Sequence, residues 1–426
     1  MEGSRPEIVR TLEELDEKIG ECDRAGSDDA LRECFGTFRM EPPSGMPGDP
    51  FSEEYRRFQL DLYRRIAGKP YSVANEETVF DIAASVQRPF PFSTGSAGTV
   101  ADSLISTGFI LRTMKLDPGS RVLELGSGWG TMTVVLAMLG HSVTALDVEK
   151  RFCELVRRRA AHDALAVEIV NADFSWIEST DRTFDAVLFT SSFHHADDHL
   201  RLMRSLHRVL IPTGCVFFAS EPIDADLSYP WGLRLDGQSL WSIRKHGWLE
   251  LGFHEGYFAE ALRRTGWFAR KHAAVEPNWL TVWEARPRAT AVLRFTPGGG
   301  LHTEIGVVDR GRIVLDRARA GTAVFGPYAT LPADDYIARI LFDAGAPRCG
   351  AAIMDVAAEA GTRRIARCSL ELGDGPPVAE LPFRAGGELK AVEVRLFCSQ
   401  GSSAVVEAVE IIPAASDALA PEGQGR

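Results

Sequence analysis

The stretch VLELGSGWG, residues 122–130, decides the fold of this chain. A strand-like run enters a loop that contains Gly126, Gly128 and Gly130, and the helix-like run TMTVVLAML follows at 131–139. Glycines permit a tight turn and let a ligand approach the backbone, while the first turn of a helix presents free N–H donors. No Gly-Lys-Ser/Thr motif follows, so the loop is not a phosphate loop. The stretch predicts a strand, a turn and a helix that together can hold a nucleotide-like ligand.

The segments after this corner alternate between strand-like and helix-like patterns. The strand-like runs are SVTALD at 142–147, VEIVNADF at 167–174, FDAVLFT at 184–190 and PTGCVFFASEPI at 212–223, and the expected helices cover 149–163 and 199–210. Such alternation predicts a parallel, doubly wound α/β sheet, in which ligands bind at the carboxyl ends of the strands. The acidic and imidazole side chains at or near these ends are Glu124, Asp147, Asp173, His194, His195 and Glu221.

In this order, the motifs resemble those of class I S-adenosylmethionine-dependent methyltransferases over residues 90–287, about half of the chain. The resemblance implies a Rossmann-like domain with S-adenosylmethionine as cofactor, whose methionine moiety lies against the glycine loop and Glu124. A dehydrogenase is the rival for such a corner, but it normally shows G-x-G-x-x-G, whose third glycine lets helix and strand pack closely. Here Thr131, Met132 and Thr133 supply no further glycine, so the methyltransferase interpretation is favoured.

The resemblance also assigns two aspartates to the cofactor. Asp147, with Val148 after it, would accept hydrogen bonds from both ribose hydroxyls, and Asp173, with Phe174 beside the ring, would bind the adenine amino group. A carboxylate at the end of the second strand is a good acceptor for a diol. The residues alone leave a second interpretation open, because either aspartate could cap the helix or turn that follows it. Thr94, in a small polar run before a helix, could hold the methionine carboxylate or simply belong to a helix-start loop.

The exit of the fourth strand, TSSFHHADDH at 190–199, is expected to carry the chemistry. Methyl transfer from a sulfonium is an in-line displacement, in which positioning supplies much of the acceleration. A hydroxyl acceptor also needs a base, for which His195 is favoured over its neighbour His194. Glu221 is an acid that could take this role instead. Packing or capping remains an equal interpretation for the two histidines.

The same stretch argues against two other kinds of site. It lacks the N/D-P-P-aromatic motif with which DNA and glutamine methyltransferases hold a planar amine. Asp197 and Asp198 could ligate Mg²⁺, but a hard cation needs several oxygen ligands, and the start of a helix already explains two acids. We therefore expect no metal.

An aromatic-rich segment follows the fifth strand, and six of the eight tryptophans lie between 231 and 283. Large rings cover apolar ligand surface and stack on sugar faces, although they also build ordinary cores. The candidate acceptor-binding residues are Trp231, Arg234, Trp241 and His254. The segment resembles methyltransferases found beside glycosyltransferases in bacterial surface-glycan pathways, which implies a sugar or glycan acceptor. Residues 263–287 are expected to close the sheet as the reversed final hairpin of the class.

The N-terminal region, residues 1–72, predicts a helical segment that precedes a methyltransferase domain at 73–287. Within it, Phe51–Ile66 has the pattern of an amphipathic helix that Ser52 caps and Gly68 ends. A packing subdomain or dimer surface is the simpler interpretation, and a lid over the active site is the alternative.

The C-terminal region, residues 288–413, shows period-2 hydrophobic runs such as Val392/Val394/Leu396 and Val405/Val409/Ile411, which predict an all-β sandwich. It resembles jelly-roll carbohydrate-binding modules. It contains no tryptophan, however, so assembly or docking is at least an equal alternative to sugar stacking. Residues 414–426 are expected to form a disordered tail.

Composition excludes several functions. The net charge of −12 and the lack of long basic runs argue against nucleic acid. Seven cysteines without a C-x-x-C pair, no signal sequence and no apolar run of membrane-spanning length predict a reduced cytoplasmic protein that does not bind a membrane. The expected function is methyl transfer to a small-molecule or glycan acceptor, most simply a sugar hydroxyl, with a homodimer left open. The alternative is a non-catalytic cofactor-binding or scaffold protein that docks a glycan or enzyme through the sandwich.

Overall fold

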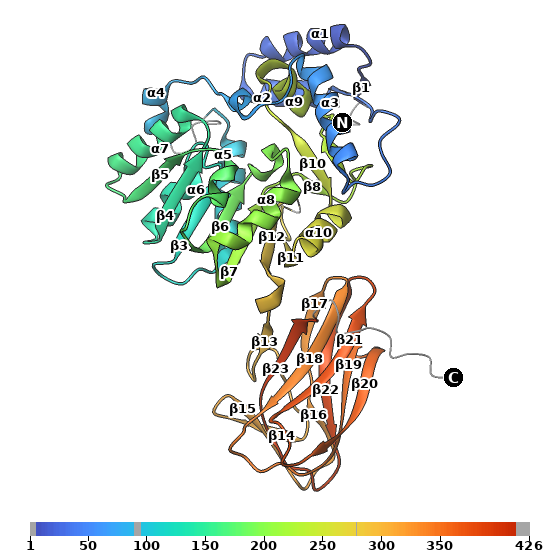
Figure 1. Cartoon of the computed structure of the whole chain (residues 1–426). Coiled ribbons are helices and arrows are strands. Elements are labelled where there is room, and N and C mark those ends of the chain that lie inside the picture. Colours follow the sequence, from blue (N-terminus) through green and yellow to red (C-terminus); the bar gives the residue numbers. More distant parts are fainter. Residues whose placement is uncertain (1–5, 89–94, 278, 415–426) are drawn as a thin grey trace. The chain divides into compact units, whose positions relative to one another are not determined.

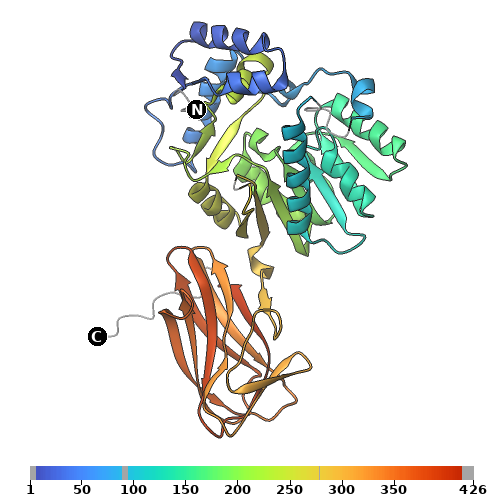
Figure 2. The ribbon, with the colours of Figure 1, turned by 180° about the vertical axis from the view of Figure 1, so that it is seen from behind.

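The computed structural model describes residues 6–88, 95–277 and 279–414 (Figure 1, Figure 2). The chain divides into two compact units, Met1–Pro287 and Arg288–Arg426. Within the described residues, no helix has both the length and the hydropathy that a membrane span requires.

The first unit is built on a seven-stranded sheet in the order β11-β12-β7-β6-β3-β4-β5. Its strands are β3 (Arg121–Leu125), β4 (Ser142–Asp147), β5 (Val167–Asn171), β6 (Phe184–Thr190), β7 (Leu210–Ala219), β11 (Trp267–Ala273) and β12 (Thr281–Pro287). The five neighbouring strands β5, β4, β3, β6 and β7 are parallel to one another. Strand β12 pairs with β7, and β11 with β12, in antiparallel orientation. This arrangement confirms the predicted doubly wound sheet and its reversed final hairpin. The carboxyl ends of the parallel strands therefore meet at one edge.

Helices cover both faces of this sheet (Figure 1). They are α5 (Ala97–Met114), α6 (Thr131–Met138), α7 (Lys150–His162), α8 (His199–Ser205) and α10 (Glu255–Arg264). Ile110 of α5 and Met132 of α6 pack with Val122 of β3 on one face. Leu202 of α8 and Phe258 of α10 belong to the core on the other. The helix expected at 199–210 is shorter, because its last residues form a 3₁₀ turn, η4 (Leu206–Val209), of the kind common at helix ends.

Two segments distant in sequence form a second layer of the first unit, which we call the cap (residues 7–76 and 222–254). Its elements are β1 (Glu7–Ile8), α1 (Leu12–Asp23), α2 (Asp28–Phe35), β2 (Phe38–Arg39), α3 (Glu53–Ala67), η1 (Val73–Glu76), β8 (Ile223–Asp224), β9 (Trp231–Leu233), α9 (Gly237–Trp241), η5 (Ser242–His246) and β10 (Leu251–His254). The Tyr55 hydroxyl donates to the Trp231 carbonyl at 2.9 Å, and Leu233 N donates to Gln59 Oε1 at 3.2 Å. The N-terminal helices therefore pack on the insertion after β7.

Helix α3 follows its sequence signals closely. The Ser52 side chain accepts from Tyr55 N, and Gly68 ends the helix in the left-handed region at φ 74°. Tyr55, Leu62 and Ile66 are buried along one face. Between the cap and the sheet, α4 (Ile82–Val86) packs beside α7.

The second unit is all-β and contains two sheets. Its elements are η6 (Arg288–Thr290), β13 (Leu293–Phe295), β14 (Gly306–Asp309), β15 (Arg312–Leu315), β16 (Gly321–Val324), β17 (Pro327–Leu331), β18 (Asp334–Phe342), β19 (Gly350–Ala358), β20 (Arg363–Leu372), β21 (Val378–Ala385), β22 (Leu389–Cys398) and β23 (Val405–Pro413). One sheet has the order β14-β15-β23-β18-β21 with β13 beside β23, and the other β16-β22-β19-β20 with β17 beside β22.

The predicted alternation in this unit holds for β22 and fails at the start of β23. Val392, Val394 and Leu396 are fully buried. In β23, Val406 is buried and Val405 is not, because the pairing with β18 shifts register at Leu341/Phe342. A shift of one residue exchanges the two faces of a strand.

Candidate functional site

The glycine loop joins β3 to α6, and two of its glycines are required by packing. Gly126, Gly128 and Gly130 all have positive φ, at 74°, 48° and 73°. A Cβ on Gly126 would lie 2.5 Å from Ser192 Cβ, and one on Gly130 would lie 2.6 Å from Val156 Cγ2. Among the described residues, no heavy atom beyond Gly128 and its two chain neighbours lies within 4 Å of the Cβ position at Gly128. The loop is therefore closed on two sides and open at Gly128, where a ligand can approach the backbone.

Asp147, at the end of β4, is tied to the glycine loop. Its Oδ2 accepts from Gly128 N at 2.7 Å, and its Oδ1 accepts from Glu149 N at 2.9 Å. Burial raises the pKa of Asp147 to about 6, against the two backbone hydrogen bonds that lower it. The N-cap residue of helix α7 is Glu149, whose side chain accepts a hydrogen bond from Arg151 N. Asp147 is therefore not the N-cap residue that the sequence alone allowed. Val148 follows at the half-buried surface.

Glu124 lies on β3 beneath the start of α6. It is buried, accepts a hydrogen bond from the Thr133 hydroxyl, and burial raises its pKa to about 8. A neutral Glu124 at moderate pH would leave Asp147 as the principal negative charge at the loop. Two hydroxyls close by, Thr131 Oγ1 and Thr190 Oγ1, are buried without a hydrogen-bond partner among the described residues. Unpartnered polar atoms beside an open loop fit a ligand with several polar groups.

Asp173 caps the turn that follows it and keeps one carboxylate oxygen free of hydrogen bonds among the described residues. It caps the 3₁₀ turn η2 (Phe174–Glu178), because its Oδ1 accepts from Ser175 N at 2.8 Å. Its Oδ2 has no hydrogen-bond partner in the part of the chain that the structure describes. The strand β5 ends at Asn171, so Asp173 lies just past the end of the strand, as expected. The Phe174 ring lies 3.8 Å from the Cβ position of Gly126, so it borders the loop.

An aromatic cluster beside the loop was not expected from the sequence. Trp129 of the loop lies between Phe80 and Phe152, with ring centroids 4.7 and 5.1 Å away. The Thr78 amide donates to Glu149 Oε2 at 3.2 Å, which fixes the segment before α4 against α7. Thr94, expected at the methionine carboxylate, lies outside the described residues, and Ser96 caps α5 through Thr99 N.

The turn after β6 is folded around one buried carboxylate. Glu221 accepts from the backbone amides of Ser192 at 2.8 Å and Phe193 at 2.9 Å, and from His194 Nδ1 at 2.8 Å. Burial alone would raise the pKa of Glu221, but His194 and these amides outweigh it and hold the pKa below its usual range. Glu221 is therefore ionised and accepts the hydrogen on His194 Nδ1. In the neutral form of this ring, the lone pair is on Nε2.

His195 has the same arrangement with a different partner. Its Nδ1 lies 2.7 Å from the Leu249 carbonyl and 3.5 Å from Glu76 Oε2. A carbonyl can only accept, so Nδ1 carries a hydrogen, and in the neutral ring the lone pair is on Nε2. The two rings are tilted by 39° relative to each other, with centroids 4.1 Å apart.

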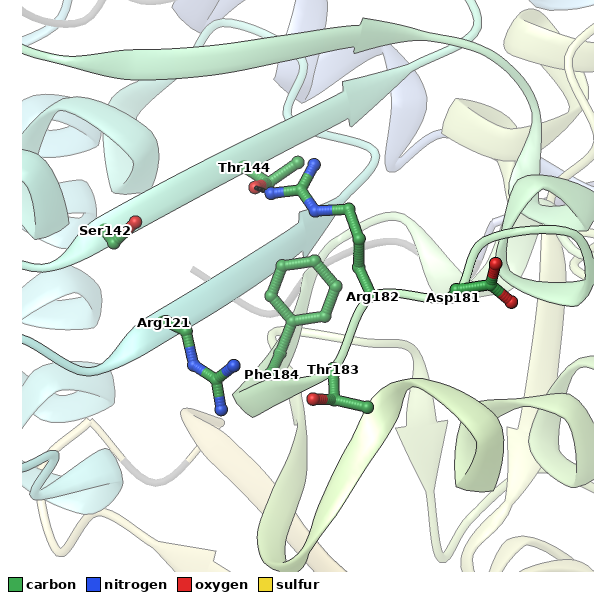
Figure 3. A pocket seen from close by; sticks show the side chains of 7 residues that line it. All are labelled: Arg121, Ser142, Thr144, Asp181, Arg182, Thr183 and Phe184. Carbon is green, nitrogen blue, oxygen red and sulfur yellow. Dashed lines mark hydrogen bonds between the residues drawn. The ribbon is translucent and has the colours of Figure 1, made fainter.

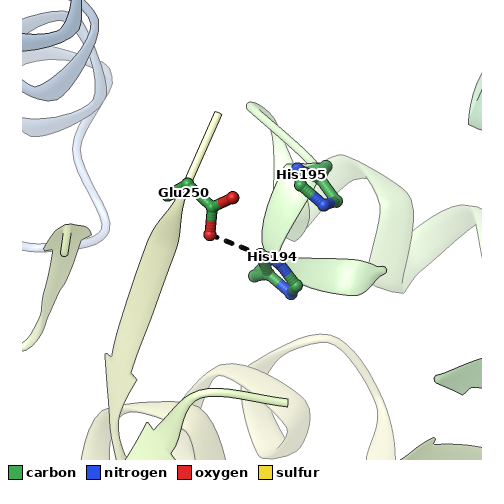
Figure 4. Close-up of side chains that lie close together, drawn as sticks. All are labelled: His194, His195 and Glu250. Carbon is green, nitrogen blue, oxygen red and sulfur yellow. Dashed lines mark ion pairs between the residues drawn. The ribbon is translucent and has the colours of Figure 1, made fainter. Parts of the chain in front are cut away.

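Glu250 of the cap faces the two histidines (Figure 4). Its Oε2 lies 3.6 Å from His194 Nε2 and 3.9 Å from Arg234 Nη1. Burial raises the pKa of Glu250 to about 6. The sequence analysis missed both Glu250 and Glu76, although an acid inside the apolar run WLELGF at 248–253 is a signal for the first. Ser192 Oγ donates to the Leu125 carbonyl at 2.6 Å, so this cluster adjoins the glycine loop.

Only one of the four predicted acceptor-binding residues reaches this cluster. Arg234 pairs with Glu250 and with Asp236. Trp231 is buried against Tyr55 and donates from Nε1 to the Pro50 carbonyl. Trp241 donates to Asp23 on the cap helices, and His254 caps α10 through Gly256 N. The last three side chains serve packing and capping, since tryptophan also builds ordinary cores.

A hollow of about 300 Å³ lies at the opposite edge of the sheet, where β3, β4 and β6 begin (Figure 3). Its arginines are already paired, Arg121 with Asp185 and Arg182 with Glu168. Ligands of doubly wound sheets bind at the other edge, so this hollow does not belong to the site.

Comparison with known proteins identifies the domain. Residues 123–218 match the family model described as a methyltransferase domain. The chain is 29% identical over 158 residues to the protein-L-isoaspartate O-methyltransferase of Methylorubrum populi, and 34% identical over 108 residues to the demethylmenaquinone methyltransferase of Clavibacter sepedonicus. These alignments cover 36% and 25% of this chain, and 70% and 44% of the two relatives. The solved DhpI–SAH complex aligns with 50% of this chain and 96% of its own, at 21% identity and a TM-score of 0.36.

The matched stretch contains the glycine loop, Asp147, Asp173 and the histidine pair. It is an enzymatic methyltransferase domain, for which S-adenosylmethionine is the methyl donor. The match ends before Glu221 and excludes the whole cap.

Proposed function

We propose that this chain transfers a methyl group from S-adenosylmethionine to a hydroxyl of a small-molecule or glycan acceptor. The observation that carries the proposal is the histidine pair, held by Glu221 and the Leu249 carbonyl beside the glycine loop. A sulfonium donor needs only a positioned nucleophile, but a neutral hydroxyl must also lose its proton. Two Nε2 lone pairs at this position are what a hydroxyl acceptor requires.

The donor side of the site fits S-adenosylmethionine. When bound, S-adenosylmethionine supplies an electrophilic methyl group from its sulfonium sulfur. The open face at Gly128 admits the ligand to the backbone, and each Asp147 oxygen keeps a lone pair beyond its backbone hydrogen bond. The free Oδ2 of Asp173 and the ring of Phe174 beside the loop support the adenine contacts that the resemblance implies.

The reaction balances without any further reactant. The acceptor O–H bond breaks, a new O–C bond forms, and the C–S bond breaks with its electron pair remaining on sulfur. The proton leaves through the histidine pair. The chain's own part is to hold the acceptor oxygen in line, keep the two Nδ1 hydrogens engaged, and present Nε2 toward the oxygen.

A polyhydroxylated acceptor fits the polar side of the cluster. Glu76 and Glu250 bring carboxylate oxygens to 3.5 and 3.6 Å from the histidine rings, and the Arg234 guanidinium lies 3.9 Å from Glu250. Such groups hydrogen-bond sugar hydroxyls. In the second unit, the two sheet orders are those of a jelly roll, an architecture that many lectin domains share. A fold does not establish a ligand, so sugar binding by that unit is part of the proposal.

The test is a transfer assay against sugars, nucleotide sugars and glycan intermediates. Release of S-adenosylhomocysteine and a product heavier by one methyl group are measured together. A methylated hydroxyl in the product supports the proposal. Methylation of an amine or carboxylate, or no acceptor-dependent release from a folded protein that binds the cofactor, would overturn it.

A further inference from the structure

We infer that His194, His195 and Glu250 form a binding site for one divalent transition-metal ion of the Zn²⁺ class. One ring nitrogen of each histidine and one Glu250 oxygen lie within 4.8 Å of one another (Figure 4). Metal binding itself follows from this geometry, while the ion's role toward an acceptor hydroxyl rests on the proposed function.

The spacing of the donors suits a small cation. Metal–ligand bonds of about 2.0–2.2 Å give roughly 3.3–3.6 Å between the ligand atoms of a tetrahedral site. His194 Nε2 and Glu250 Oε2 already lie 3.6 Å apart. The separation is long for a hydrogen bond and short enough for an ion between the two atoms. A modest approach of His195 completes three ligands, the number that catalytic zinc sites use while leaving a further position open.

The partners of the histidines match those of metal-binding histidines. Such ligands donate their second ring N–H to a carboxylate or a backbone carbonyl, which fixes the tautomer and the ring orientation. His194 has the Glu221 carboxylate at 2.8 Å and His195 has the Leu249 carbonyl at 2.7 Å. Both Nε2 atoms are thus left as donors to a cation. Packing alone does not require that two adjacent histidines each have a hydrogen-bond partner at Nδ1.

The charges around the cluster favour a cation. Glu221, Glu250 and Glu76 bring three carboxylates to the histidines, and Arg234 is the one cationic side chain that pairs with Glu250 in the described part of the chain. The Glu221 side chain is fully buried, and those of Glu250 and Glu76 are 11% exposed. Buried charge of one sign is costly unless it is paired or bound to a metal.

The donor set also selects the kind of ion. Imidazole nitrogens suit Zn²⁺ and its first-row neighbours, whereas Mg²⁺ prefers oxygen ligands. The two acids considered for Mg²⁺ from the sequence are engaged elsewhere: Asp197 pairs with Arg56, and Asp198 caps α8. An ion at the histidines would act as a Lewis acid toward the acceptor hydroxyl. Because both Nε2 lone pairs would then be on the ion, the hydroxyl proton would pass to water and not to the histidines, while the oxygen would still take the methyl group from the sulfonium.

The first experiment measures binding in the full-length protein. The protein is stripped with a chelator and titrated with Zn²⁺ by calorimetry, and bound metal is counted by elemental analysis. Co²⁺ is added in parallel, because tetrahedral Co²⁺ has a visible absorption that reports its ligands. One ion per chain with Kd in the micromolar range or tighter is expected. No saturable binding below about 100 μM would overturn the inference.

Variants identify the ligands. Glu250→Gln and His195→Asn each remove one ligand while keeping size and polarity, and each should weaken Zn²⁺ binding at least about 30-fold. Glu221→Gln acts through His194 and should cost about 10–100-fold. His272→Asn is the matched control, because His272 also pairs with a carboxylate, Glu284, but outside the cluster. Thermal unfolding confirms that each variant folds. Unchanged affinity in the folded ligand variants would overturn the assignment.

The result separates this inference from the proposed function. Zn²⁺ binding that depends on Glu250, with no methylated hydroxyl product, would sustain the metal site and refute the function. Methyl transfer to a hydroxyl that survives chelation, without Zn²⁺ binding, would sustain the function and refute the metal site.

Discussion

The donor and acceptor sides of the site are built in different ways. On the donor side, backbone groups dominate: three glycines shape the loop, and Asp147 is held by two amide N–H groups. On the acceptor side, side chains from four separate segments converge, as Glu76, His194, Glu221 and Glu250 do. A site made of backbone needs few particular residues, whereas a site made of converging side chains can be altered one group at a time. The first side suits a shared cofactor and the second a particular acceptor.

The largest expected effect removes the acceptor side alone. His194→Ala should lower turnover about 10²–10⁴-fold, because either proton transfer or metal ligation loses its group. Cofactor affinity should stay within about threefold, since the Asp147 hydrogen bonds do not involve this ring. Single-turnover rates and calorimetry measure the two quantities on the same preparation. If cofactor affinity fell as far as turnover, the two sides would not be separable.

A smaller loss is expected from the donor side. An ionic hydrogen bond contributes about 1.5–3 kcal/mol, so Asp147→Ala should weaken cofactor binding by about one to two orders of magnitude. Turnover at saturating cofactor should change little, because the histidine cluster stays intact. Asp173→Ala is the comparison: its Oδ1 is occupied by Ser175, and we expect a weaker loss. Unchanged affinity in a folded Asp147→Ala protein would refute the donor assignment.

The contrast also explains how much the sequence could reveal. The donor side is encoded within 22 residues, which contain Gly126, Gly128, Gly130 and Asp147. The alternation of strand and helix patterns around them predicts the edge of the sheet at which these residues meet. Glu76 has no local signal, because only the packing of the N-terminal segment brings it to His195. Trp231 and Trp241 looked like acceptor contacts, since composition cannot distinguish a stacking ring from a core ring. The chain therefore encodes the donor side locally and the acceptor side through tertiary structure.

A still smaller effect concerns pH. Burial, with help from Glu149, raises the pKa of Asp147 to about 6, while His195 opposes the shift. The proton competes with the ribose hydroxyls, so cofactor affinity should fall about tenfold from pH 7 to pH 5 and be level above pH 7. The effect on stability has the opposite sign: a raised carboxyl pKa favours the folded state at low pH, and this contribution is lost as pH rises through 6.

Calorimetry at several pH values measures this dependence, with Asp147→Asn as the control. The asparagine cannot titrate, so its affinity should be weaker and should not vary over this range. Glu124 also faces Asp147, and Glu124→Gln tests whether it contributes. A wild-type affinity that is flat between pH 5 and 7 would mean that another group binds the ribose.

The smallest effect is expected from removing the second unit. The two large apolar cores beside the main sheet contain only residues up to Ala285, and Arg288 makes its ion pair with Asp334 in the second unit. A fragment that ends at Pro287 should therefore fold and bind S-adenosylmethionine with Kd within about twofold of the full chain. Activity on a small acceptor should remain, whereas activity on a long glycan should fall if the second unit holds that acceptor. Trp279 is 55% exposed, so aggregation of the fragment must be monitored by gel filtration. An insoluble or cofactor-free fragment would show that the second unit stabilises the site itself.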